Sequence, residues 1–144
     1  VTWTAYDADP VETHVLEALS LGEIALDLRQ AVRDTTAMID ALDAKPWSSR
    51  LRSLADDLPG KGWGLPDGLP PRAHRIMATA SQVGAAAELG LSIHAESQVL
   101  TSQLTGQRRL LLTHLDAIAD LAMAGAATVA ALSLAGLRPD HGDR

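Results

Sequence analysis

The sequence contains no cysteine and no phenylalanine, and aromatic residues make up only 3% of its 144 residues. Without cysteine the chain forms neither disulfide bonds nor thiolate metal sites, and thiol catalysis is excluded. With so few aromatic residues, the core volume must come from leucine, alanine, valine and isoleucine. Such a composition suits closely spaced helices better than sheets, in which aromatic and β-branched residues are enriched.

The chain also lacks a basic excess. It has 12 Lys and Arg against 18 Asp and Glu, a formal net charge of −6, which argues against a broad basic face and so against a DNA partner. No charged segment followed by an apolar one opens the sequence, so we expect a cytoplasmic protein. Its richness in alanine and in arginine over lysine suggests a bacterial source. At this length we expect one domain, residues 1–144, with a core of its own.

The most apolar part of the chain runs from Leu110 to Leu137. Apolar and small residues recur there at alternating steps of four and three, the spacing of one face of an α-helix. The small members of this stripe allow a neighbouring backbone to approach closely. We therefore predict an interface between two copies of the chain at the following residues: Ala122, Gly125, Ala126, Val129, Ser133 and Gly136.

Two other interpretations of this helix stay open. It could be a core helix packed only within the monomer, or a membrane span. Asp116 and Asp120 and the absence of a Trp or Tyr belt argue against a span, so no membrane partner is expected. Four further leucines are spread around the same helix, so apolar surface is expected to remain after one neighbour has packed on it: Leu121, Leu132, Leu134 and Leu137.

The first half of the chain carries clear helix signals. Asp9 and Pro10 are an N-cap residue and a first helical residue, and the helix they start can run to Ala44. The apolar stripe changes phase part-way along, where Ser20 and Glu23 have the spacing of a capping box. A kink or a short break is expected there.

The middle of the chain is dense in glycine and proline. A short helix over residues 51–58 is expected to precede a loop over residues 58–70. We expect Trp63 in this loop to plug one end of the bundle or to contact a partner. Residues 1–8 are expected to be an extended arm with Tyr6 on the bundle, and residues 138–144 a flexible tail.

A second helical pattern resumes at Pro71 and contains two glycines at which the chain could turn, Gly90 and Gly106. The apolar stripe stays in phase across Gly106, as in one continuous helix. Such a helix from Ser92 onward would be about 67 Å long, which is too long for a compact monomer of this size. We therefore predict a turn at Gly106.

Histidines suggest one weak metal site. If the chain reverses near Gly106, His94 and His114 lie level on adjacent antiparallel helices, with Glu96 and Asp116 nearby. Metal sites in helical bundles use such facing ligands. No Glu-x-x-His pair accompanies them, so we predict neither a metal nor any other cofactor.

A second weak signal is the pair Arg109 and His114. Its Arg-x4-His spacing resembles the motif of HEPN-type helical ribonucleases, which are small all-α dimers. The resemblance implies metal-independent RNA cleavage, with the Arg and His of two subunits meeting in one cleft. It covers only six positions, and Leu110 and Asp116 stand where the family usually has a polar residue and often a tyrosine.

We therefore predict an all-α, up-and-down bundle of three long, partly kinked helices and one short helix. The predicted function is a non-enzymatic protein-interaction module that forms a homodimer. A HEPN-like endoribonuclease, with RNA as its partner, is the alternative, and a bundle that binds a metal or a small apolar ligand is the third hypothesis. No phosphate-binding loop, nucleophile elbow or His-Glu-x-x-His motif is present.

Overall fold

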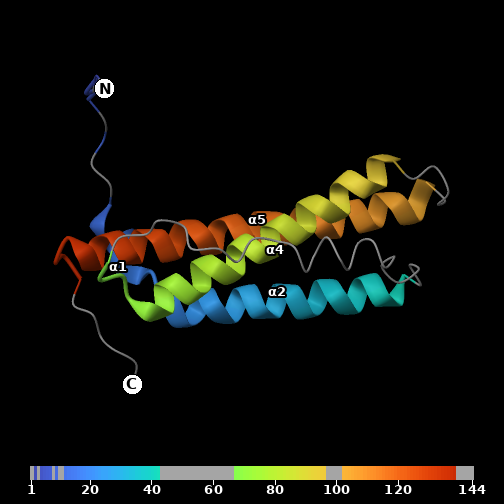
Figure 1. Cartoon of the computed structure of the whole chain (residues 1–144), viewed down its shortest axis with the longest axis horizontal. Helices are drawn as coiled ribbons and strands as arrows, with labels where there is room; N and C mark the ends of the chain where they lie inside the picture. Colours follow the sequence, from blue (N-terminus) through green and yellow to red (C-terminus); the bar gives the residue numbers. More distant parts are fainter. Residues whose placement is uncertain are drawn as a thin grey trace.

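The computed structural model describes residues 2, 4–7, 9, 12–42, 67–96 and 102–138, with backbone only for 93–96 and 102–103. Most of these residues lie in four helices (Figure 1): α1 (Thr13–Ala18), α2 (Leu21–Ala41), α4 (Pro71–Glu96) and α5 (Ser102–Leu134). No residue in these ranges belongs to a strand. The prediction of an all-α bundle with three long helices is confirmed.

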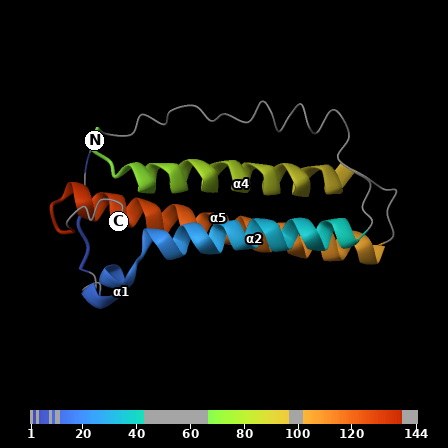
Figure 2. The same cartoon turned by 90° about the horizontal axis from the view of Figure 1, so that it is seen from below.

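Helix α5 is the centre of the arrangement. It packs along α4 and against α2, whereas α2 and α4 contact each other much less. In two perpendicular views α5 runs antiparallel to both neighbours (Figures 1 and 2). The buried core that joins the three helices consists of Leu28, Ile76, Met77, Ala80, Ala119, Ala122 and Ala126. Alanine dominates on α5, so its neighbours approach its backbone closely.

The predicted break in the first helix is confirmed. Ser20 has extended backbone dihedrals, and its Oγ accepts the Glu23 backbone N–H at 3.4 Å, which caps the start of α2. The predicted helix start at Asp9 is wrong, because α1 begins at Thr13. This six-residue helix has no buried residue, so no tertiary packing extends it towards Asp9.

The predicted turn at Gly106 is also wrong. Helix α4 continues through Gly90 and α5 through Gly106, and the chain reverses between Glu96 and Ser102. Gly90 lets two helices approach closely, since a Cβ there would lie 2.9 Å from Leu112 Cδ1. The unbroken phase of the apolar stripe was the better signal, because packing along a helix outweighs the cost of about 1 kcal/mol for one internal glycine.

Several predictions concern residues outside the described ranges. They are the short helix over residues 51–58, the position of Trp63 with most of the loop over residues 58–70, and nearly all of the tail over residues 138–144. The described residues of the arm are not helical. Tyr6 is 85% exposed rather than packed on the bundle.

Candidate protein-interaction surface

The seam predicted as an interface lies mostly inside the monomer. Ala122, Ala126 and Val129 are at most 5% exposed, and a Cβ on Gly125 would lie 2.9 Å from Ile24 Cδ1. Helices α2 and α4 cover this side of α5. The central residues of the seam are therefore not at the surface of the monomer, whereas Ser133 is half-buried and Gly136 is exposed.

The end of the predicted seam closes the helix. Gly136 is exposed and has φ of +69°, a conformation that favours glycine. Its N–H donates to the Ser133 carbonyl at 3.0 Å, and the Leu137 N–H donates to the Leu132 carbonyl at 2.9 Å. This pair of hydrogen bonds is the Schellman motif that ends many helices, so Gly136 has a structural role there.

The opposite side of α5 carries a second apolar stripe. Its residues again follow steps of four and three, and all except the half-buried Thr128 are exposed. We call them the outer face of α5: Leu110, His114, Ala117, Leu121, Ala124, Thr128, Ala131 and Ala135. The sequence analysis predicted that apolar surface remains on this helix but did not identify this stripe. Its regular spacing of four and three residues is the signal that identifies it.

The outer face of α5 is exposed to an unusual degree. Leu110 and Leu121 are each 72% exposed. Among the described residues, α5 alone is long and apolar enough to pass a length-and-composition test for a membrane span, and only 28% of its most apolar 18-residue stretch is buried. Soluble monomers rarely expose contiguous apolar patches larger than a few hundred Å². The stripe is therefore a candidate contact surface.

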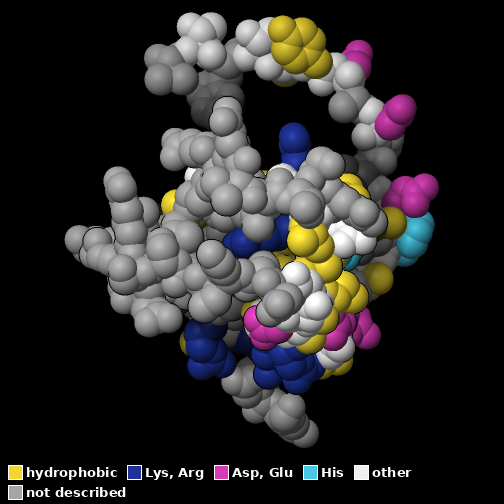
Figure 3. All heavy atoms as spheres, turned by 90° about the vertical axis from the view of Figure 1, so that its right-hand side faces the viewer, with side chains coloured by type: hydrophobic (Ala, Val, Ile, Leu, Met, Phe, Trp, Pro, Cys, Tyr) yellow, Lys and Arg dark blue, Asp and Glu magenta, His cyan; other side chains and the backbone are white. Residues whose placement is uncertain are grey.

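The charged residues of α5 end at Asp120. Arg109 and Asp120 are exposed, and from Leu121 to Leu137 there is no charged residue. Arg108 is half-buried with its Nε unbonded, and burial lowers the pKa of its guanidinium. Viewed end-on, the molecule shows hydrophobic side chains at the surface between groups of acidic and basic ones (Figure 3). An apolar partner on the second half of the outer face would therefore meet no charged residue of α5.

The two residues of the ribonuclease hypothesis do not converge within the chain. Arg109 and His114 are both exposed on α5, and a regular helix separates residues five positions apart by about 140°. The His94 side chain lies outside the described part of the structure, which contains no group of three or more His, Asp or Glu that could hold a metal ion.

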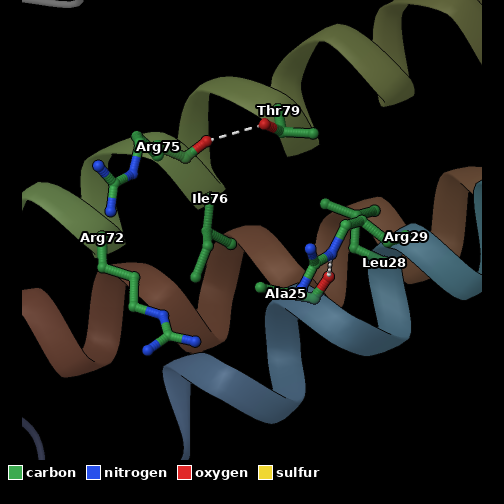
Figure 4. A pocket seen from close by; sticks show the side chains of 7 residues that line it. All are labelled: Ala25, Leu28, Arg29, Arg72, Arg75, Ile76 and Thr79. Atoms are coloured by element: carbon green, nitrogen blue, oxygen red, sulfur yellow. Dashed lines mark hydrogen bonds between the residues drawn. The ribbon is translucent and has the colours of Figure 1, made fainter. Parts of the chain in front are cut away.

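Two hollows open beside α2. The larger, about 440 Å³, lies between α2 and α4, and Arg29, Arg72 and Arg75 line it around the apolar Ile76 with their guanidinium groups apart (Figure 4). Arg29 Nε donates to the Ala25 carbonyl at 3.0 Å, and Arg72 and Arg75 have interaction partners too. Guanidinium groups can hold an anion, but these three are already engaged.

The smaller hollow, about 330 Å³, lies between α2 and α5. Ile24 and Ile118 line it, and Leu121 stands at its edge with Asp27. It therefore adjoins the outer face of α5 and extends the apolar surface around Leu121 towards α2. Its lining offers no acid–base pair or nucleophile for catalysis.

Comparison with known proteins places the chain in a family. Residues 22–139 match the family model described as Rv1486c-like protein, C-terminal domain. The chain belongs to this family. The match spans α2, α4 and α5, so the three-helix bundle is the family's domain, and the description names no activity or partner. No curated protein and no solved structure matches the chain.

Proposed function

We propose that this domain is a non-enzymatic protein-interaction module that pairs with a second copy of itself through the outer face of α5. The supporting observation is the exposed stripe on a helix whose other side already holds the core. Leu110 and Leu121 each leave 72% of their surface in water. Burying a leucine side chain contributes about 1.5–3 kcal/mol. In a symmetric pair this contribution comes from the same leucine in both copies.

A second copy suits this surface better than a lipid bilayer. Asp120 is exposed beside the face, and a carboxylate within a bilayer costs at least about 2.5 kcal/mol. No Trp or Tyr occurs from Ser102 to Arg138 to anchor the helix at a membrane surface. The net charge of −6 also disfavours anionic lipid.

The size of the surface sets the expected strength of the dimer. From Leu110 to Ala135 the helix extends over about 38 Å. A strip of that length covers several hundred Å² of each copy, at the small end of specific interfaces. We therefore expect a dimer that dissociates at micromolar concentrations, which corresponds to about −8 kcal/mol.

The test compares two lysine substitutions at exposed leucines. Leu121→Lys places a charge on the outer face of α5, whereas Leu26→Lys places one on α2, where Leu26 is 53% exposed. In sedimentation velocity, Leu121→Lys is expected to weaken the dimer at least about tenfold, or 1.4 kcal/mol, with unchanged helical circular dichroism. The matched Leu26→Lys variant is expected to dimerise normally.

Two outcomes would contradict the proposal. One is an unmodified protein that is monomeric at every concentration. The other is a dimer that Leu26→Lys dissociates and Leu121→Lys leaves intact, because the contact would then involve α2 instead.

A further inference from the structure

The outer face of α5 also contains the information for the direction of pairing. We infer that the two copies pair antiparallel, with the two-fold axis between Leu121 and Ala124. This inference rests on the proposed function and adds the orientation and register of the partner. It is drawn from the order of large and small side chains on the face and from the charges along the helix.

The face consists of two rows, each with a step of seven residues. One row is Leu110, Ala117, Ala124 and Ala131, and the other is His114, Leu121, Thr128 and Ala135. A step of seven keeps residues in line along a helix seam. Reversing one helix about the stated axis places each row of one copy opposite the other row of its partner.

This register matches a larger side chain with an alanine in every layer. The layers, from the axis outward, are Leu121 with Ala124, Thr128 with Ala117, His114 with Ala131, and Leu110 with Ala135. Each layer then has a similar width, so the helices stay at a constant separation within the usual 8–10 Å. Leucine can insert between alanines of the facing helix, as a side chain inserts into a hole in a coiled coil.

A parallel pair would place each residue level with its own copy. Leu110 and Leu121 would each meet another leucine, while Ala117 and Ala124 would each meet another alanine. Layers of two large side chains and layers of two alanines would then lie along the same seam. Helices that are far enough apart to accommodate two leucines in one layer leave a void between two alanines in another. Such unfilled apolar space is destabilising.

Electrostatics favours the same direction. In a parallel pair, Arg109 and Asp120 would each lie level with a like charge on the partner, and like charges repel. The two helix dipoles would also point the same way. In the antiparallel pair, the charged first half of one α5 lies beside the uncharged stretch from Leu121 to Leu137 of the other.

Disulfide trapping tests this geometry cleanly, because the chain has no cysteine. The variants are His114→Cys and Ala131→Cys, both at exposed positions within the regular part of α5. A disulfide forms only when the two Cα atoms lie within about 4.4–6.8 Å. In the antiparallel pair, position 114 lies level with position 131 of the partner, and the two copies of either position are about 25 Å apart.

We expect a mixture of the two variants, after mild oxidation, to give a covalent dimer that contains one chain of each. Neither variant oxidised alone is expected to give a covalent dimer on a non-reducing gel. Ala37→Cys, at an exposed alanine of α2, measures disulfides formed by random collision. Circular dichroism checks that every variant keeps its helices.

The outcomes separate this inference from the proposed function. Parallel pairing would give covalent dimers of each variant alone, His114→Cys or Ala131→Cys, and no mixed species. That result would overturn the inference but agree with the proposed self-association. A dimer in sedimentation that gives no specific disulfide would place the contact elsewhere and overturn the register. Monomers in sedimentation before oxidation would overturn the proposed function itself.

Discussion

The outer faces of α2 and α5 have opposite chemistry, although both helices pack on the same core. On α2 the face is polar: Gln30 Nε2 donates to Asp34 Oδ1 at 3.0 Å, and Arg33 Nη2 donates to Gln30 Oε1 at 2.7 Å. On α5 the outer face consists of alanines and leucines except at His114 and Thr128. The outward face of α2 thus offers polar groups to water, whereas that of α5 exposes mainly apolar side chains.

Contiguity distinguishes the two faces more than the number of exposed leucines does. Leu26 and Met38 of α2 are each 53% exposed, but they lie among polar residues, and scattered apolar residues are normal on protein surfaces. Leu110 and Leu121 lie in one regular stripe in which only His114 and Thr128 are polar. The contrast therefore predicts that substitutions on α2 change stability alone and that substitutions on the outer face of α5 change association.

The largest expected effect is a loss of stability from substitutions on the inner sides of α2 and α5, which both contribute to the core. Leu28 is 2% exposed at the centre of the core, and Leu28→Ala is expected to lower the free energy of unfolding by about 2–5 kcal/mol. Urea denaturation measures the loss. The matched variant Leu26→Ala, on the exposed side of the same helix, should lose far less, and equal losses would contradict the assignment of the inner face.

An intermediate effect is expected from bulk added to two adjacent positions of α5. Gly125 faces Ile24 inside the monomer, so Gly125→Leu should overpack the contact between α2 and α5 and destabilise the fold by about 1–3 kcal/mol. Ala124 is exposed on the outer face, so Ala124→Leu should leave the fold intact and weaken the dimer.

Urea denaturation at low protein concentration and sedimentation at high concentration separate these two results. If Ala124→Leu unfolds the monomer and Gly125→Leu only splits the dimer, the inner and outer sides of α5 have been exchanged in our description.

The smallest effect is expected on the polar face of α2. Asp34→Ala removes the hydrogen bonds between Gln30 and Asp34, and a helical pair of this spacing stabilises by about 0.2–0.5 kcal/mol. Thermal denaturation should show this small loss with unchanged self-association. A change in the dimer mass would mean that the outer side of α2 takes part in the contact.

The sequence was sufficient for the fold class and for the break at Ser20, because helical periodicity and capping are local. It was misleading at Gly106, because glycine is common both just past helix ends and, at a modest cost, inside helices. Only the phase of the apolar stripe distinguished the two cases.

Whether the small-residue side of α5 packs within its own chain or on a second copy could not be predicted from the sequence. The two stripes of the helix follow the same spacing, although the outer one contains His114 and Thr128, and spacing does not identify the partner of either. The small residues around Gly125 indicated a close approach of backbones, which is correct. That the approaching helix is α2 of the same chain, with Ile24 against Gly125, depends on the path of the whole chain.

Sedimentation equilibrium of the unmodified protein tests the central claim most directly. Over about 0.05 μM to 100 μM, a range that spans the expected dissociation constant of about 1 μM, the mass should rise reversibly from near the 15.2 kDa of the monomer towards twice that value. A single species of 15.2 kDa over the whole range would contradict the claim that a second copy covers the outer face of α5.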